Sequence, residues 1–171
     1  MGRSYNAGTL DSMPEFTFRR ATESDRTYLQ RLNYLTDVFG DESAELDHDA
    51  REGVAPYIDD WSPERDGGII AFDEHRTPAG GVWLRYWASP EVGHAHVAPN
   101  IPEIAIAVEN RFAGNQLAVK LLHEVAELAR EQGAPKIALW VDPDNDRARH
   151  RYESFGFVAV EDEGDVMVFE L

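Results

Sequence analysis

Residues 102–157 constrain the fold most, because strand and helix patterns alternate along them. Two short apolar runs, 103–108 and 136–141, have the length and composition of buried strands. Between them, apolar side chains recur at helical spacing over 117–132, and a shorter helical stretch, 147–154, follows the second run. Strands that alternate with helices in this way predict an α/β fold.

The rest of the chain adds further strands and helices to this unit. We expect strands at 16–20, 67–72, 80–87, 157–160 and 166–171, and helices from Tyr28 to Leu35 and at 44–57. The strands at 67–72 and 80–87 predict one antiparallel hairpin, and the last two strands predict another. The resulting order favours a mixed sheet over a regular doubly wound one.

The length of 171 residues is that of one domain. We expect a mobile extension at 1–14 and a single folded domain at 15–171. No apolar run approaches the roughly 20 residues that cross a bilayer, and the N-terminus lacks the layout of a secretory signal. We therefore expect a cytoplasmic protein with no membrane partner. The absence of cysteine from the sequence excludes disulfides, thiolate metal sites and a cysteine nucleophile.

The net charge of −16 argues against a nucleic-acid partner, since phosphate backbones are bound by clustered Lys and Arg. The acidic residues are concentrated in residues 37–60, which contain nine of them and a single arginine. This segment has two interpretations: it could attract a cationic ligand, or it could be an acidic face exposed to solvent.

The strand at 103–108, the turn at 110–116 and the helix that begins at Leu117 form a potential anion-binding unit. Backbone N–H groups at the start of a helix, together with the helix dipole, favour a phosphate. The Walker and Rossmann glycine patterns are absent from this turn. A second pattern follows the next strand: it consists of Asn145, Ala148, Tyr152 and Gly156-Phe157, separated by two, three and three residues.

The order of elements and these residues resemble the GNAT superfamily of acyl-CoA-dependent N-acetyltransferases, over roughly residues 16–171. The resemblance implies a strongly twisted mixed sheet with helices on both faces, splayed between the fourth strand (103–108) and the fifth strand (136–141). It also implies that the chain transfers an acetyl group from acetyl-CoA, as cosubstrate, directly to a primary amine, with no acyl-enzyme and no metal.

The family's pyrophosphate-binding pattern, Arg/Gln-x-x-Gly-x-Gly/Ala, falls on Ala113 to Ala118, and only Ala118 matches it. An alternative register that begins at Arg111 restores the arginine and a glycine but loses the last small residue, so we prefer the first register. The cofactor-binding residues that the resemblance implies are Ile106, Ala107, Val108, Ala113, Gly114, Asn115, Gln116, Leu117, Ala118 and Asn145.

The resemblance assigns Tyr152 as the acid that protonates the leaving thiolate and Glu103 as the base that deprotonates the amine. Each has a plain structural alternative: Tyr152 as a core aromatic, and Glu103 as an exposed acid at a strand end. His94 and His96 could replace Glu103 as the base, since histidine titrates near neutral pH. The two histidines alone do not make a metal site, because a third ligand is lacking.

Substrate-binding candidates lie on and after the strand at 80–87. Trp83 and Trp87 share one face of it and Tyr86 takes the other, so one face is expected in the core and the other beside the acceptor. With His94 and His96, Trp83 and Tyr86 are the expected acceptor-binding residues.

The acceptor implied is a primary amine on a small molecule or a peptide, and the acidic segment favours a cationic one. Arg147, Arg149 and Arg151 are expected on the surface, where one could meet a CoA phosphate. A homodimer, a bulkier acyl group and a non-catalytic module with a degraded pyrophosphate loop remain alternatives.

Overall fold

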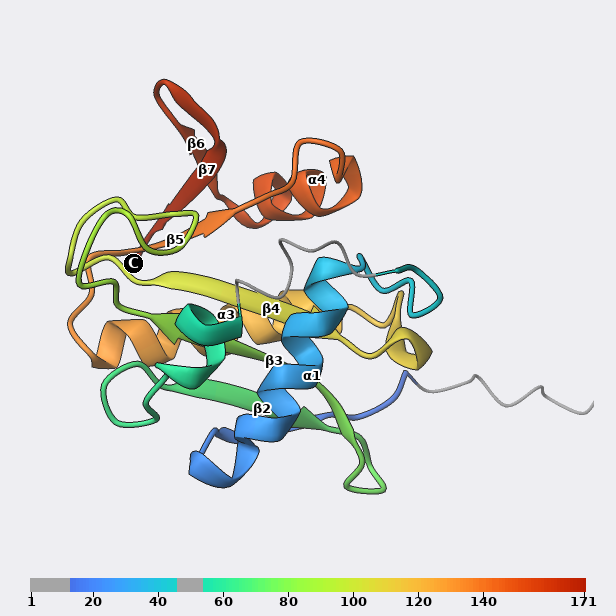
Figure 1. Cartoon of the computed structure of the whole chain (residues 1–171). Helices are drawn as coiled ribbons and strands as arrows, with labels where there is room; N and C mark the ends of the chain where they lie inside the picture. Colours follow the sequence, from blue (N-terminus) through green and yellow to red (C-terminus); the bar gives the residue numbers. More distant parts are fainter. Residues whose placement is uncertain (1–12, 46–53) are drawn as a thin grey trace, which may run out of the picture.

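The computed structural model describes residues 13–45 and 54–171, which form a seven-stranded sheet with helices on both faces (Figure 1). The strands are β1 (Thr17–Arg20), β2 (Gly68–Phe72), β3 (Pro78–Arg85), β4 (Glu103–Val108), β5 (Lys136–Trp140), β6 (Val158–Val160) and β7 (Glu163–Glu170). The helices are α1 (Arg26–Asp37), α3 (Leu117–Glu131) and α4 (Asp146–Phe155), with short turns of helix at η1 (Glu23–Asp25), η2 (Ala55–Asp59) and η3 (Asn110–Phe112). This arrangement confirms the mixed α/β sheet that the sequence predicts.

The sheet opens between β4 and β5. Its strand order is β1-β2-β3-β4-β5-β7-β6, and every pair is antiparallel except β4 with β5. These two parallel strands are paired only at Glu103 and Ala138, where the Ala138 N–H donates to the Pro102 carbonyl oxygen at 2.9 Å. Beyond that point they diverge (Figure 1), which confirms the predicted splay.

Helix α1 covers one face of the sheet. Its buried leucines pack against Ile70 and Trp83, from β2 and β3. Leu32 lies so close to β3 that a Cβ atom on Gly81 would come within 2.8 Å of its Cδ1 atom. Glycine at this position therefore lets the helix approach the sheet closely.

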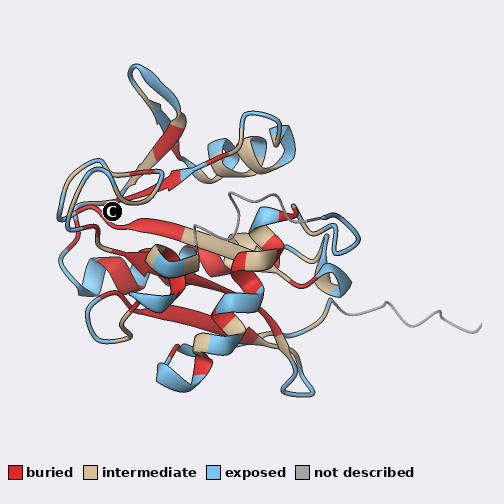
Figure 2. Cartoon of the chain, viewed as in Figure 1, coloured by how far each residue is buried: buried red, intermediate tan, exposed pale blue. Residues whose placement is uncertain are grey.

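Helix α3 covers the opposite face with a continuous apolar stripe. Leu121, Leu122 and Val125 are fully buried and pack against Val82, Ile104 and Ile137 of the sheet. Figure 2 shows the buried strands between the two helices, with the tip of the β6–β7 hairpin exposed. The two cores fix the position of β4, whose side chains alternate between them.

Some bounds differ from the sequence-based expectation. Strand β3 begins at Pro78 and ends at Arg85, two residues earlier than predicted at each end, because a register shift at Phe72 lets Pro78 pair with it. The predicted helix at 44–57 falls largely on residues 46–53, outside the described part, and its described end is the π-helical turn η2. The predicted extension at 1–14 likewise lies almost wholly outside the described residues. Within 13–45 and 54–171, no helix is long and apolar enough to cross a bilayer.

Candidate active site

A cavity of about 680 Å³ lies where β4 and β5 separate. Its walls come from the whole of β4, the end of α1, the first turn of α3, the end of β5 and the inner side of α4. The strands diverge and leave a space between them, and the walls of this space come from segments that are far apart in the sequence.

The edge of β4 that faces this space has unpaired backbone groups. Since the Pro102 carbonyl oxygen bonds β5, alternation directs the N–H and C=O groups of Ile106 and the N–H of Val108 toward the same edge. Ile106, Ala107 and Val108, which the sequence analysis assigns to cofactor binding, all line the cavity. Such an edge can hydrogen-bond an extended amide-containing ligand.

The start of α3 also faces the cavity and has no side-chain cap. Gln116, the N-cap residue, has a left-handed backbone with φ +59° and makes no capping hydrogen bond. The first N–H groups of an α-helix have no acceptor within the helix, and here they belong to Leu117, Ala118 and Val119, which line the cavity. This helix start can therefore bind an anion.

The turn before α3 is open to a ligand. A Cβ atom on Gly114, where φ is +82°, would have nothing within 4 Å. The left-handed conformation at Gln116 is one that glycine adopts without strain. Gln116 is where the preferred register puts the family's first glycine, and the left-handed backbone there is one that favours glycine.

Helix α4 contributes two cationic side chains to the same wall. Arg147 and Arg151, one turn apart, line the cavity, and no carboxylate in the described part of the chain pairs with either. Arg149 points elsewhere and pairs with Asp165 at 3.3 Å. The Oδ1 atom of Asn145 accepts a hydrogen bond from the Ala148 N–H at 3.2 Å, so this predicted cofactor residue caps α4.

Tyr152 lines the cavity from α4. Its ring packs edge-on against Phe157 at 5.8 Å, and its burial raises the pKa of the phenol. None of the described residues hydrogen-bonds its hydroxyl, and no buried side-chain oxygen in residues 13–45 and 54–171 is left unpaired, so this hydroxyl retains contact with solvent. A protonated phenol with a free hydroxyl can donate a proton to a ligand.

Glu103 is a buried carboxylate and not an exposed strand-end acid, since only 3% of it is exposed. Its Oε1 atom accepts from the Tyr57 hydroxyl at 2.7 Å, and its Oε2 atom accepts from the Trp87 indole at 2.7 Å. The N–H groups of His94 and Ala95 also donate to Oε2, at 3.3 and 3.2 Å. Burial outweighs these hydrogen bonds and raises the pKa of the Glu103 carboxyl.

Aromatic rings surround this carboxylate. The Tyr57 ring stands edge-on to Trp87 at 5.0 Å and stacks on His94 at 6.0 Å, and His94 lies 4.9 Å from Trp140. Tyr57, His94 and Trp140 line the cavity beside Glu103. The sequence analysis missed Tyr57 and Trp140; the only signal for Tyr57 was an aromatic residue next to Pro56 in a weak helical pattern.

Four predicted site residues do not line the cavity. Trp83 is fully buried under η2, where its indole N–H donates to the Tyr57 carbonyl oxygen at 3.1 Å. The Tyr86 hydroxyl donates to Gln132 at 2.6 Å, on the side of the sheet that α3 covers. The Asn115 side chain bonds the Phe112 carbonyl oxygen at 3.2 Å, and His96 is also absent from the cavity wall.

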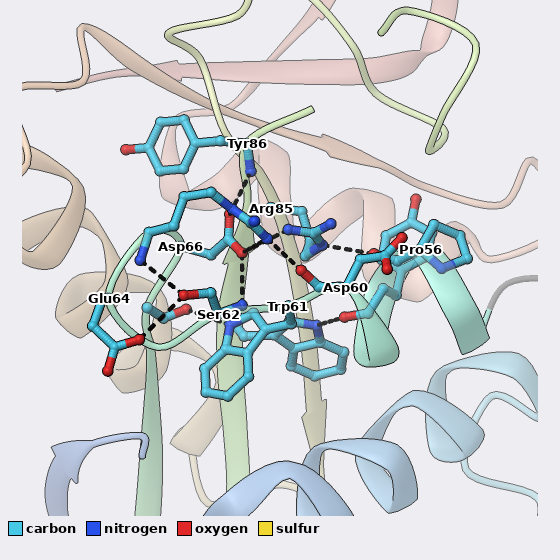
Figure 3. Close-up of polar contacts among 12 residues, drawn as sticks. Pro56, Asp60, Trp61, Ser62, Glu64, Asp66, Arg85 and Tyr86 are labelled. Atoms are coloured by element: carbon cyan, nitrogen blue, oxygen red, sulfur yellow. Dashed lines mark hydrogen bonds and ion pairs between the residues drawn. The ribbon is translucent and has the colours of Figure 1, made fainter. Parts of the chain in front are cut away.

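A buried ion pair anchors the segment that carries Tyr57 (Figure 3). Arg85 and Asp66 are 2.6 Å apart, and Asp66 is completely buried. The Arg85 Nε atom donates to the Pro56 carbonyl oxygen at 2.7 Å, while the Ser62 and Tyr86 N–H groups donate to Asp66. Residues 56–66 are thereby fixed to the end of β3.

Of the acidic residues of segment 37–60 that the structure describes, Asp37 alone lines the cavity. Partial burial raises the pKa of its carboxyl to about 6. Glu42 instead pairs with Arg31 at 3.0 Å. Asp47, Asp49 and Glu52 lie outside the described residues. Over residues 13–45 and 54–171, no group of three or more His, Cys, Asp or Glu side chains is arranged to hold a metal ion.

The chain is similar in sequence or in fold to known acetyltransferases. Mycothiol acetyltransferase from Nocardiopsis dassonvillei is 30% identical over 108 residues, which are 58% of this chain and 30% of that relative's length. The GNAT-family acetyltransferase of Staphylococcus aureus Mu50 has the same fold, with a TM-score of 0.69 at 14% identity over 92% of this chain and 99% of that one.

A second solved structure has the same fold with a ligand bound. The PaiA N-acetyltransferase of Thermoplasma acidophilum, in complex with coenzyme A, matches with a TM-score of 0.64 at 14% identity, over 92% of this chain and 99% of that one. The acetyltransferase (GNAT) family model matches residues 28–157, which include most of α1, the splayed strands and the whole of α4. The chain therefore belongs to the GNAT family of acetyltransferases.

Proposed function

We propose that the chain is an N-acetyltransferase that moves an acetyl group from acetyl-CoA to a primary amine, with no acyl-enzyme. One observation carries the proposal: a buried carboxylate, Glu103, and an unpaired phenol, Tyr152, line the same cavity as the exposed edge of β4. A general base, a general acid and a polarising N–H group are the three functions that direct acyl transfer needs.

The lining of the cavity suits acetyl-CoA. The uncapped start of α3 and the open turn at Gly114 would hold the pyrophosphate, and Arg147 or Arg151 would pair with a further phosphate. The free edge of β4 at Ile106 and Val108 would bind the amide groups of the pantetheine arm. Coenzyme A in the PaiA N-acetyltransferase supports this assignment.

The residues of the chain divide the chemistry between them. Acetyl-CoA supplies the acetyl group activated as a thioester. The Ile106 N–H, on the splayed edge, would donate to the thioester carbonyl oxygen. Glu103, whose raised pKa suits proton uptake, would receive the proton of the amine, and Tyr152 would give its proton to the departing sulfur.

The wall around Glu103 suits a cationic acceptor. The rings of Tyr57, His94 and Trp140 line the cavity beside Glu103, and the carboxyl group of Asp37 lines it at the end of α1. An ammonium group is attracted by both kinds of group. The acceptor we propose is therefore a primary amine that is protonated in solution, on a small molecule or a peptide.

A second function, binding of acyl-CoA without catalysis, is favoured by one observation. Gln116 has a bulky side chain and a left-handed backbone at the position where the family has glycine. A chain with this role would bind acetyl-CoA and release no thiol.

Thiol release from acetyl-CoA across a panel of primary amines tests the proposal. We expect wild type to release thiol, and Tyr152→Phe to lower kcat by about 100-fold or more, as is usual for loss of a general acid. Tyr86→Phe, which removes a hydroxyl outside the cavity, should stay within about threefold. Binding of acetyl-CoA with no thiol release from any amine would favour the non-catalytic function instead.

A further inference from the structure

Tyr57 lines the cavity, and its hydroxyl donates a hydrogen bond to the buried Glu103 carboxylate. We propose that the acceptor amine meets Tyr57, and that this hydroxyl relays the amine's proton to Glu103. The inference rests on the proposed function and deepens it: Tyr57 becomes a catalytic residue, and Glu103 acts through it.

The contacts of Glu103 argue against direct contact with an amine. A carboxylate has about four acceptor positions on its two oxygens. Three N–H donors surround Oε2, from Trp87, His94 and Ala95, and the Tyr57 hydroxyl occupies one of the two acceptor positions on Oε1. Only 3% of Glu103 is exposed, and among the described residues Tyr57 is the one side-chain partner of this carboxylate that also lines the cavity.

The Tyr57 hydroxyl has one acceptor position to spare. A phenol has one O–H donor and two lone pairs. Its O–H donates to Glu103 Oε1 at 2.7 Å, and one lone pair accepts from the His94 N–H at 3.0 Å. No donor within residues 13–45 and 54–171 occupies the second lone pair, which can accept an N–H of an ammonium group, and both Tyr57 and His94 line the cavity.

The proton transfer balances without forming a tyrosinate. The ammonium N–H bond breaks, its electron pair stays on nitrogen, and its proton passes to the Tyr57 oxygen. The phenol's own proton moves at the same time to Glu103 Oε1, so Tyr57 ends as a neutral phenol and Glu103 ends protonated. Burial and the neighbouring Glu103 charge raise the pKa of Tyr57, which agrees with a phenol that never ionises alone.

The backbone on both sides of the Tyr57 side chain is held in place. The Trp83 indole donates to the Tyr57 carbonyl oxygen at 3.1 Å, and Arg85 donates to the preceding carbonyl oxygen, that of Pro56, at 2.7 Å. Tyr57 also lies in a π-helical turn, a rare form that is frequent at functional sites. The hydroxyl is therefore preorganised for a relay.

The test compares two amines with wild type and Tyr57→Phe, which keeps the ring and removes the hydroxyl. A primary alkylamine is protonated at pH 7, since its pKa is near that of lysine, about 10. Methoxyamine is neutral at that pH and needs no initial deprotonation. The relay predicts that Tyr57→Phe lowers kcat/KM about 100-fold for the alkylamine and by less than about fivefold for methoxyamine.

The matched control is Tyr28→Phe, which removes another hydroxyl that donates to a carboxylate, that of Glu109, at 3.0 Å and outside the cavity wall. It should change neither rate. An equal loss on both amines, or no loss, in Tyr57→Phe overturns the relay alone. A wild type that turns over neither amine, nor any amine of the panel, overturns the proposed function and the relay with it.

Discussion

At the scale of single residues, two glutamates have opposite environments: Glu103, the first residue of β4, and Glu109, the residue that follows β4. Among the described residues, Glu103 accepts hydrogen bonds from uncharged donors only, and burial raises the pKa of its carboxyl. Glu109 accepts from the Arg31 guanidinium at 2.8 and 2.9 Å, which lowers the pKa of its carboxyl. A buried carboxyl with no cationic partner costs stability when it ionises, which is typical of a group kept for function.

This contrast predicts opposite pH dependences of stability for two variants. Because the folded pKa of Glu103 is raised, the folded protein binds more protons, and wild type loses stability relative to Glu103→Gln as pH rises above about 4.3, the ordinary value for Glu. Because the folded pKa of Glu109 is lowered, wild type loses stability relative to Glu109→Gln as pH falls through and below that value.

Urea unfolding of the three proteins from pH 3 to pH 8 measures both slopes. Across this pH range, the free energy of unfolding of wild type relative to each variant should change by about 1.4 kcal/mol for each unit of pKa shift. Slopes of the same sign for the two variants would mean that the environment of one glutamate differs from that described. The Tyr57 hydroxyl can rotate to accept from the new amide, so Glu103→Gln should fold.

The sequence predicts single site residues only where a local pattern carries them. Tyr152 and Ile106 line the cavity because helix and strand spacing fix their direction. Alternation also puts Trp83 and Trp87 on one face, as the structure confirms, but it does not say what covers that face. The segment that covers it is η2, which carries Tyr57. Tyr57 bonds Glu103, which is 46 residues away in the sequence, so no local pattern predicts this contact.

At the scale of elements, residues 56–66 depend on a buried ion pair. Asp66 binds two arginines: Arg85, which is 5% exposed, at 2.6 Å, and Arg65, which is 54% exposed, at 2.8 Å. The same carboxylate thus has one buried and one exposed cationic partner. Removing one member of a buried pair leaves an uncompensated buried charge, whereas an exposed pair contributes little.

We therefore expect Arg85→Met and Arg65→Met to differ strongly in stability. The first should lower the free energy of unfolding by roughly 3–5 kcal/mol, and the second by at most about 1 kcal/mol. Urea unfolding at pH 7 gives both values. Equal small losses would show that Asp66 is held by its backbone donors alone and that Arg85 does not anchor η2.

Elements with a clear period could be predicted from the sequence, and irregular ones could not. The strands β4 and β5 and the helix α3 match their predicted ranges within a residue, because apolar period and length specify them. The π-helical turn η2 and the early start of β3 at Pro78 depend on the Arg85 contact and on a register shift, which no local pattern records.

At the scale of the whole molecule, the two cores hold β4 rigidly while its β5 side remains open. The side chains of β4 pack alternately against α1 and α3, and its backbone edge is free after Glu103. The family relationship made this opening predictable from the sequence. Of the acidic residues of segment 37–60 that the structure describes, by contrast, Asp37 alone lines the cavity, and Glu42 pairs with Arg31, which also binds Glu109.

We propose above all that this opening binds acetyl-CoA, with its phosphates at the start of α3. Titration calorimetry with acetyl-CoA tests it on wild type and two variants that add the same charge. Ala118→Asp puts a carboxylate at the anion site, where the helix dipole tolerates it, and Thr27→Asp puts one on the exposed side of α1. We predict that wild type and Thr27→Asp bind alike and that Ala118→Asp binds at least about tenfold more weakly, a cost of about 1.4 kcal/mol. No binding by wild type at millimolar acetyl-CoA, or equal binding by Ala118→Asp, would contradict the account.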